Sequence, residues 1–307
     1  MIKKFIIAVL IFSPVLFAQF QRPGSTDAQF LKIGISPRGT AMGDAYISVV
    51  DGAEGTFYNS AALAWIKGTD IVFTHNFWFA GINHDFAAAG HSFGDLGTFA
   101  AAVTALYTDL MKVRTPLQPD GTGETFYAGN YKFGISYSRF FTEQVTVGLT
   151  LNYINMTLYK GFSADAFSVD IATMYTSEFR GFKFAMQISN FGSQVSYVNE
   201  SYPLPTAFTF GASINAVDGE DQKVLVSFAA TKPNDGQPLT QVGGEWNFRN
   251  TFFTRGGYKI NYDVATYSFG AGVRLDVGGL DTRVDYSYSK FGLLGVAHRV
   301  GIGVNIQ

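Results

Sequence analysis

Apolar and polar residues alternate with a period of two along most of this chain, and no other feature constrains its fold as strongly. In residues 264–277, apolar side chains occupy every second position from Ala265 to Val277, and Thr, Ser, Gly, Arg and Asp fill the positions between them. Residues 279–289 and 296–306 repeat the pattern. Successive side chains on a β-strand point to opposite faces, so each segment is expected to form a strand with one apolar and one polar face.

The same pattern predicts about fourteen antiparallel strands, an even number that suits a bacterial single-chain barrel with both ends in the periplasm. The predicted strands are 69–79, 82–93, 96–107, 129–141, 144–159, 164–176, 180–190, 205–217, 221–231, 239–249, 251–261, 264–276, 279–289 and 296–306. Short links at 141–143 and at Asn250 are predicted to be periplasmic turns. Residues 108–128 and 191–204 are predicted to be long outer loops.

The composition favours a membrane barrel over a soluble β-protein. Charged residues make up 15% of the 307 residues, against roughly 25% in a typical soluble protein, and aromatic residues make up 16%. A soluble sandwich or propeller would have to hide an aromatic-rich face on nearly every strand, and the sequence has no blade-length repeat. The mean hydropathy of +0.11 is too low for a bundle of membrane-spanning helices. We therefore expect an all-β outer-membrane barrel.

The N-terminus has the three regions of a secretory signal peptide. Lys3 and Lys4 form a positive region, an apolar run follows to Phe17, and Ala18 ends a plausible cleavage site. The alternative is a membrane anchor, but the run is short of the ~20 residues that a spanning helix needs. Without a spanning helix, membrane insertion requires closed β-structure. The predicted organisation is a signal peptide at 1–18, a plug at 19–68 and a barrel at 69–307, located in the bacterial outer membrane.

The sequence predicts no enzyme, cofactor, metal site or nucleic-acid partner. The net charge of −2 offers no attraction for nucleic acid, and the absence of cysteine removes thiolate chemistry. The four histidines are scattered without metal-ligand spacing: His75, His84, His91 and His298. The Gly270–Gly272 pair lies within a predicted strand with no helix after it, so it does not resemble a dinucleotide-binding loop.

Residues 28–67 do not alternate, and we expect them to form a compact helical plug inside the barrel. Ser36 followed by Pro37 is a favoured helix start, because serine caps the free amides and proline fits the first helical position. A second short helix is predicted from Asn59, its cap, to Trp65. The small side chains of this segment suit a confined lumen.

The plug segment also resembles a known family. The stretch FLKIG…RGTAMGDAYISVVDGAEGTFYNSAALAW is similar to the N-terminal signature of the PorV/PorQ family of outer-membrane proteins, which have the fourteen-stranded FadL-type barrel. The matching plug motif consists of Gly34, Arg38, Ala41, Met42, Gly43, Ala45, Asp51, Tyr58, Asn59, Ala61, Leu63 and Ala64. The chain departs from the family pattern at Gly52, Ser60 and Ala62, where the family has Asp, Pro and Gly.

The resemblance implies a binding or scaffolding role in type IX protein secretion. The implied partners are other secretion components, the surface-attachment complex and the C-terminal sorting domains of cargo, besides outer-membrane lipid. The alternative is a FadL-like transporter of hydrophobic small molecules, with an apolar pocket between the plug and the outer loops. A structural barrel without transport is a third alternative. One barrel fold serves several functions, so the sequence leaves these open.

The alternation also places charged residues of the C-terminal strands on the inward face. This predicted charge ladder consists of Glu245, Arg249, Arg255, Lys259, Arg274, Asp276, Asp281, Arg283 and Asp285. Opposite charges on neighbouring strands lie close enough to pair, so the ladder would anchor the plug. The alternative is the polar lining of a conduit. With a plug and a ladder filling the lumen, we expect little or no steady conductance.

Overall fold

The computed structural model describes residues 23–306. The predicted signal peptide at 1–18 and the first plug residues at 19–22 lie outside the described residues, so those predictions stay predictions. Between residues 23 and 306, no helix is both long and apolar enough to cross a membrane.

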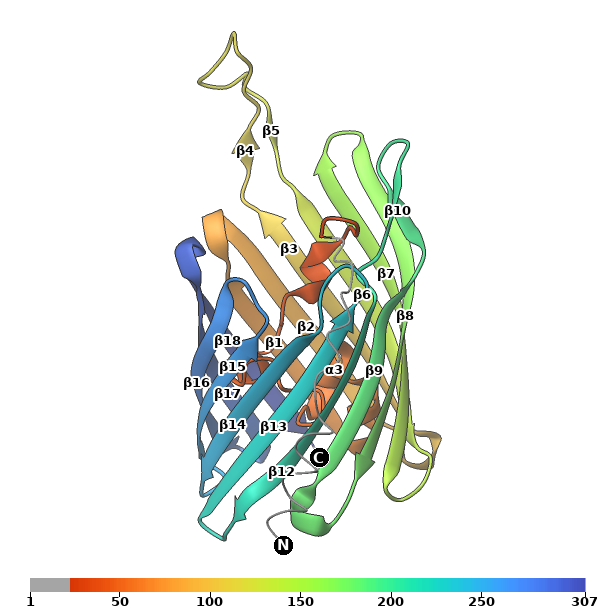
Figure 1. Cartoon of the computed structure of the whole chain (residues 1–307), viewed down its shortest axis with the longest axis vertical. Coiled ribbons are helices and arrows are strands. Elements are labelled where there is room, and N and C mark those ends of the chain that lie inside the picture. The colour runs from red at the N-terminus through yellow and green to blue at the C-terminus, as the bar shows by residue number, and fades with distance from the viewer. Residues whose placement is uncertain (1–22, 307) are drawn as a thin grey trace, which may run out of the picture.

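In the described part of the chain, fourteen antiparallel strands close into one barrel (Figure 1). Closure is made between the first and last strands, where Thr69 pairs with Ile306 and Phe77 with His298. The barrel strands are β1 (Thr69–Phe77), β2 (Ile82–Ser92), β3 (Thr98–Thr108), β6 (Gly129–Phe140), β7 (Val145–Tyr159), β8 (Phe162–Thr176), β9 (Lys183–Gly192), β12 (Ala207–Asp218), β13 (Gln222–Pro233), β14 (Leu239–Phe248), β15 (Phe252–Ile260), β16 (Ala265–Val277), β17 (Leu280–Phe291) and β18 (Val296–Ile306).

The fourteen predicted strands are confirmed, and most of their ends differ from the prediction by only a few residues. The two predicted long loops contain short hairpins: β4 (Met111–Lys112) with β5 (Thr125–Phe126), and β10 (Gln194–Ser196) with β11 (Ser201–Pro203). Both hairpins rise from the same end of the barrel (Figure 1). Long loops face the cell exterior in such barrels, so we call this the outer end and the opposite one the periplasmic end.

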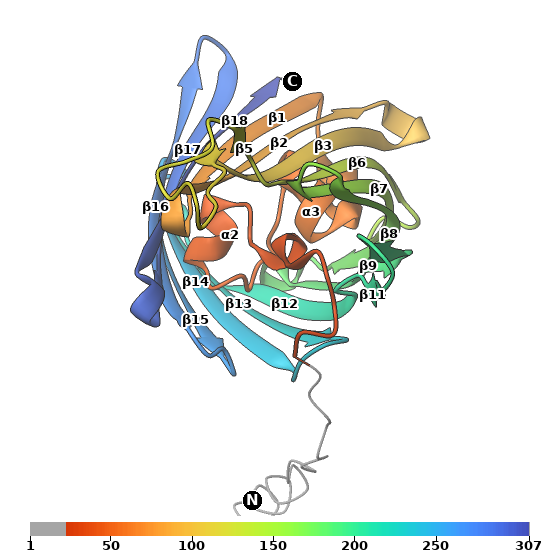
Figure 2. The same ribbon diagram turned by 90° about the horizontal axis from the view of Figure 1, so that it is seen from above.

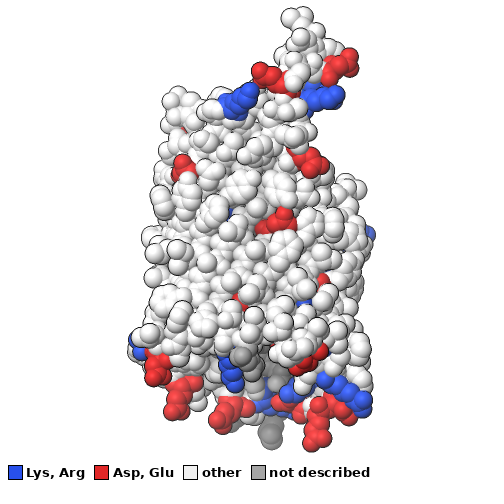
Figure 3. Space-filling model, turned by 180° about the vertical axis from the view of Figure 1, so that it is seen from behind, with Lys and Arg blue, Asp and Glu red and all other residues white. Residues whose placement is uncertain are grey.

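Each strand turns its apolar face outward. In β7, Val147, Leu149 and Leu151 are exposed on the outside of the wall, whereas the intervening Thr146 and Thr150 are buried in the lumen. Figure 3 shows the result from behind: the wall carries few charged side chains, and these gather at the two ends. An uncharged belt between charged ends is what a lipid bilayer requires of a barrel.

The lumen holds the plug, which is made of short helices (Figure 2). These are η1 (Gln29–Lys32), α2 (Pro37–Ala41), η2 (Gly52–Glu54), α3 (Gly55–Tyr58) and η3 (Ser60–Trp65). The predicted capping at Ser36 is present, because its Oγ accepts a hydrogen bond from the Gly39 amide at 3.1 Å. The hydrophobic core lies between plug and wall, where Tyr46, Ile47 and Val50 pack with Ala172, Met174, Ala185 and Ala229.

Glycines of the wall allow the plug backbone to touch it. A Cβ on Gly257 of β15 would lie 2.0 Å from the Gly43 nitrogen, and a Cβ on Gly148 of β7 would lie 2.3 Å from the Ser60 carbonyl carbon. No side chain fits at such distances. A Cβ on Gly243 of β14 would lie 2.5 Å from the Met42 carbonyl oxygen, and Gly270 and Gly301 approach the side chains of Ala41 and Pro37. The plug is therefore held by backbone contact on both sides of the lumen.

Candidate functional site

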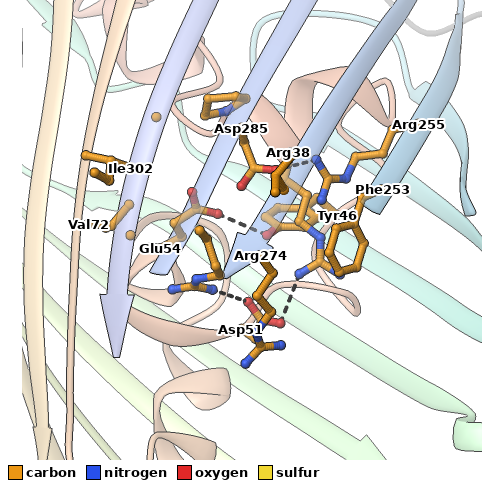
Figure 4. Close-up of a pocket in the computed structure, with 15 residues that line it drawn as sticks. Arg38, Tyr46, Asp51, Glu54, Val72, Phe253, Arg255, Arg274, Asp285 and Ile302 are labelled. Carbon is orange, nitrogen blue, oxygen red and sulfur yellow. Dashed lines mark hydrogen bonds and ion pairs between the residues drawn. The ribbon is translucent and has the colours of Figure 1, made fainter. Parts of the chain in front are cut away.

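Arg38, at the start of α2, is the centre of an ion-pair network between the plug and the wall. Its Nε and Nη2 donate to the two carboxylate oxygens of Glu245 on β14, each at 2.8 Å. Its Nη1 donates to Asp51 Oδ2 of the plug at 2.9 Å (Figure 4). A two-point pair between a guanidinium and a carboxylate is among the stronger polar contacts in proteins. Arg38 therefore ties α2 to both β14 and the next plug segment.

Two wall arginines extend this network. Arg283 of β17 donates to Asp51 Oδ1 at 2.9 Å and to Asp70 Oδ2 of β1 at 2.8 Å. Arg255 of β15 donates to Glu245 at 2.6 Å and also pairs with Asp285 of β17. We call the set of these charged groups the lumen charge network: Arg38, Asp51, Asp70, Glu245, Arg255, Arg283 and Asp285.

Two plug carboxyls near the network have shifted pKa values in opposite directions. Burial would raise the pKa of Asp51, but the positive charges of Arg38 and Arg283 outweigh it and hold the pKa below the usual range. Burial raises the pKa of Glu54 to about 7, because a hydrogen bond with Ser36 and the positive charge of Arg283 offset only part of the loss of solvation. Glu54 also accepts a hydrogen bond from the Tyr46 hydroxyl at 3.0 Å. The network thus keeps one of these acids charged.

The structure brings together four members of the predicted charge ladder, Glu245, Arg255, Arg283 and Asp285, in the lumen charge network. Lys259 pairs with Asp44 of the plug, and Arg274 pairs across the strands with Asp281 near the periplasmic end. We predicted that these residues would pair between neighbouring strands. Most of their partners instead lie in the plug or two strands away along the wall. Asp44 and Asp70 were not among the predicted residues. The alternation places Asp70 inward with Val72, but no local signal indicates that Asp44 meets Lys259, 215 residues later.

Arg249 does not lie in the lumen, which corrects its predicted inward position, and Asp276 is on the predicted face of β16 but exposed near the periplasmic end of the strand. Arg249 has a positive φ of 54° in the β14–β15 turn, where the alternation ends, and it donates to the exposed Asp221 at 3.0 Å. Asp276 is exposed beside the β16–β17 turn and accepts a hydrogen bond from the Gly279 amide at 2.8 Å. Strand periodicity does not extend into turns, so it misplaced Arg249. Asp276 still pairs within the ladder, opposite Asp281.

The plug motif residues meet inside the barrel. Asn59 caps η3 through a hydrogen bond from the Ala61 amide and donates to the Ile47 carbonyl, both at 3.0 Å. The Tyr58 hydroxyl accepts from the Ser36 amide at 3.2 Å, beside Gly34. Ala41, Met42 and Leu63 are fully buried, and Gly43 contacts β15 with a φ of +66°. With Arg38 and Asp51 in the network, every residue of the motif serves to fold or dock the plug.

A cavity of about 240 Å³ lies between the plug and the outer ends of β9 and β12–β15. We call it the outer cavity. Its apolar lining includes Leu31, Ile47, Phe57, Pro205, Ala207, Pro233 and Leu239, and its polar lining includes Tyr58, Gln187, Thr209, Thr231, Gln241 and Tyr262. The Lys259–Asp44 pair forms part of its floor, and Lys32 lies at its rim. An engineered cavity of about 150 Å³ binds benzene, so the outer cavity has room for a small aromatic molecule.

Lys32 also fastens the first plug residues over this cavity. Its ammonium group pairs with Asp235 in the β13–β14 loop, with an Nζ–Oδ1 distance of 2.7 Å. The Thr26 hydroxyl and the Gln29 amide donate to the same carboxylate. Burial tends to raise the pKa of Asp235, but the hydrogen bonds and the charge of Lys32 lower it overall. We call residues 26–32 the strap.

The periplasmic half of the lumen contains two cavities with charged side chains in their linings. One, of about 50 Å³, is lined by Arg38, Tyr46, Glu54 and Arg255 among others (Figure 4), and the other, of about 160 Å³, opens near Trp65 and Lys67. Asp51, Arg274 and Arg283 line both. The lumen is therefore mixed in character at the outer end and strongly charged at the periplasmic end, with the plug between them.

The four histidines, considered as candidate metal ligands, line neither the outer cavity nor the two periplasmic cavities. His84 is buried in the lumen, whereas His75 and His298 face outward and hydrogen-bond to Asp85 and Tyr286. His91 bonds to Thr69 at the periplasmic end of β2. Among residues 23–306, no group of three or more His, Cys, Asp or Glu could hold a metal ion.

The closed barrel with a helical plug is the FadL-type outer-membrane fold, and solved structures of that type match it over nearly their whole length. The toluene transporter TodX of Pseudomonas putida has a TM-score of 0.60 at 11% identity, over 88% of this chain and 97% of TodX. The toluene transporter TbuX of Ralstonia pickettii has a TM-score of 0.56 at 14% identity, over 88% and 97%.

A FadL homologue of Pseudomonas aeruginosa matches with a TM-score of 0.52 at 10% identity, over 93% of this chain and 98% of the homologue. No protein-family model matches the sequence, and no curated protein matches it. The chain is thus a bacterial outer-membrane barrel with the FadL-type fold. The PorV/PorQ resemblance of the plug has no support from these comparisons.

Proposed function

We propose that this barrel passes hydrophobic small molecules from the cell exterior into the outer membrane, without chemistry of its own. The outer cavity carries the proposal, because it is a partly apolar space of about 240 Å³ at the outer end, closed below by the plug. The matched structures include two named toluene transporters, which adds support from the shared fold. This reverses the preference of the sequence analysis, which placed the transporter second.

The proposed exit leads sideways through the wall beside the outer cavity. The β8–β9 ladder shifts register between Val169 and Ile171, and Asn190 there has a φ of +57°. The Asp170 carboxylate accepts the Asn190 amide proton at 2.6 Å in place of a ladder bond. Pairing of β9 with β12 ends at Ser189. The wall therefore has fewer strand-to-strand hydrogen bonds here than along its regular ladders.

A lipid-facing groove lies across the wall from the outer cavity. It has a volume of about 440 Å³ and is lined by outward side chains that include Leu149, Ile171, Ile188 and Phe208. Gln187 lines both the groove and the outer cavity, so a single layer of wall separates the two. A molecule leaving the cavity at this place would enter lipid and avoid the charged periplasmic half of the lumen.

The test is uptake of radiolabelled toluene by cells that express the chain in an outer membrane lacking other FadL-type barrels. Ala207→Phe fills the outer cavity, and Ala212→Phe adds the same ring to the same strand away from it. We expect uptake with the native chain and with Ala212→Phe, and loss of uptake with Ala207→Phe. Uptake no greater than in the empty host, or full uptake with Ala207→Phe, would contradict the proposal.

A second candidate is the binding role in type IX secretion that the plug motif implies. The β4–β5 hairpin favours it, because the hairpin projects from the outer end and its Leu117 is 93% exposed (Figure 1). Affinity purification from the native membrane distinguishes the two. Recovery of secretion components or sorting-domain cargo, lost when residues 113–123 are replaced by a short turn, would support the binding role.

A further inference from the structure

The outer cavity contains two buried glutamines whose side-chain oxygens have no hydrogen-bond partner. Gln187 of β9 is 6% exposed and Gln241 of β14 is 3% exposed. Both side chains line the outer cavity, and the Oε1 atom of each lacks a partner in the described structure. Buried polar atoms are almost always hydrogen-bonded in folded proteins, so two such oxygens at one cavity need an explanation.

The surroundings of Gln187 determine which end of its amide lacks a partner. Its Nε2 donates to the Phe57 carbonyl oxygen at 3.4 Å. Rotating the amide would bring two oxygens together, which is unfavourable because neither can donate. Gln241 uses its Nε2 at the Tyr262 hydroxyl, 2.7 Å away, and at Thr231 Oγ1. The hydroxyls of Tyr262 and Thr231 can also donate, so turning the Gln241 amide gives its oxygen partners. The acceptor that requires a donor at the outer cavity is therefore Gln187 Oε1.

The other polar groups of the cavity restrict the charge of a ligand. Lys259 is paired with Asp44, and Lys32 with Asp235, so neither cation is left without a carboxylate. A charged ligand would have to break one of these pairs or remain unpaired, and an unpaired charge is costly to bury. Apolar side chains such as Ile47, Phe57 and Leu239 supply the rest of the lining. A neutral molecule with an apolar body fits these conditions.

We propose that the outer cavity selects neutral single-ring molecules that carry a hydroxyl or N–H donor over hydrocarbons of the same shape. This inference rests on the proposed transport function and gives its substrate class. The donor hydrogen-bonds to Gln187 Oε1, and the ring contacts the apolar lining. A hydrocarbon would fill the same space but leave this oxygen without a partner. One hydrogen bond to a buried, otherwise unpaired acceptor is expected to change affinity about tenfold.

The experiment measures binding of p-cresol and p-xylene to the full-length barrel purified in detergent. The two probes have the same shape and differ in one hydroxyl, and the ratio of their affinities is compared between variants so that partition into detergent cancels. The variant is Gln187→Leu, with Gln144→Leu in the exposed β6–β7 turn as the matched control. The heat-dependent electrophoretic shift of folded barrels verifies folding.

We expect Gln187→Leu to lower the p-cresol to p-xylene affinity ratio about tenfold, with p-xylene binding retained and Gln144→Leu unchanged. If folded Gln187→Leu keeps the native ratio, the donor-selection inference is overturned while the proposed transport function stands. If the native chain binds neither probe, both are overturned.

Discussion

Replacing Gly257 by alanine should loosen the plug, whereas the same change at the preceding residue, Gly256, should not. A methyl group on Gly257 would lie 2.0 Å from the Gly43 nitrogen and 2.1 Å from the Met42 carbonyl carbon, and ordinary contact begins near 3.4 Å. The added methyl group would clash with backbone atoms of the plug, which cannot rotate away as a side chain can, so the plug must move away from β15. A methyl group on Gly256 would meet only the Phe269 ring, at 3.7 Å.

The cost of such overpacking is about 1–3 kcal/mol. If this cost destabilises the docked plug and not the undocked plug, the fraction of molecules with an undocked plug rises about 5- to 150-fold. The chain has no native cysteine, so one introduced thiol reports on this fraction. Ala45→Cys places it in the plug at a position that is 1% exposed. The assay is the rate of modification by a water-soluble maleimide in the Gly257→Ala and Gly256→Ala backgrounds.

We expect faster labelling only in the Gly257→Ala background. Equal rates in the two backgrounds would show that the close approach of Gly43 and Met42 to β15 does not hold the plug. A variant that no longer folds would be identified by its electrophoretic shift and would be replaced by Gly243→Ala. Gly243 lies on the neighbouring strand β14, and its added methyl group would lie 2.5 Å from the carbonyl oxygen of Met42 in the plug.

Three further predictions concern the ionic contacts and the lumen. Arg38→Met removes one ion-pair partner from each of Glu245 and Asp51 and should lower the free energy of unfolding in urea by about 3–5 kcal/mol. Adding Glu245→Gln should recover part of this loss. If the losses of the two single variants add in the double variant, Arg38 and Glu245 are not energetically coupled. The pKa of Asp235 is lowered in the folded chain, so the strap contact is fully present above the ordinary carboxyl pKa and is lost as pH falls through the lowered value. Maleimide reacts with the thiolate and slows in acid, so each rate is divided by that of an exposed Gln144→Cys control at the same pH. This relative rate for Leu31→Cys should be higher in acid than at neutral pH, and with Asp235→Asn added it should be high at both. A relative rate for Leu31→Cys alone that does not change with pH would contradict this. In planar bilayers the native barrel should give no steady porin-like current, and Gly257→Ala should give intermittent openings.

The strand pattern by itself determined the barrel. Period-two alternation is a local property, and a closed antiparallel sheet is the main way that strands with one apolar face can lie in lipid, so the fourteen strands could be located one at a time. The helix start at Ser36 was predictable for the same reason, since a cap and the amides it satisfies lie within four residues. The predicted signal peptide also depends on local composition alone.

Only the tertiary structure decided what the lumen contains. Arg38 and Glu245 are 207 residues apart, and their contact depends on the closure of the barrel and on how the plug sits within it. The same holds for Lys259 with Asp44 and for the two glutamines at the outer cavity. Alternation predicts that a side chain faces inward, but it does not predict the position of that side chain along the barrel axis or the residue it contacts. Arg249 was misplaced because its turn interrupts the alternation, and the choice of transport over secretion came from a cavity that no single segment forms.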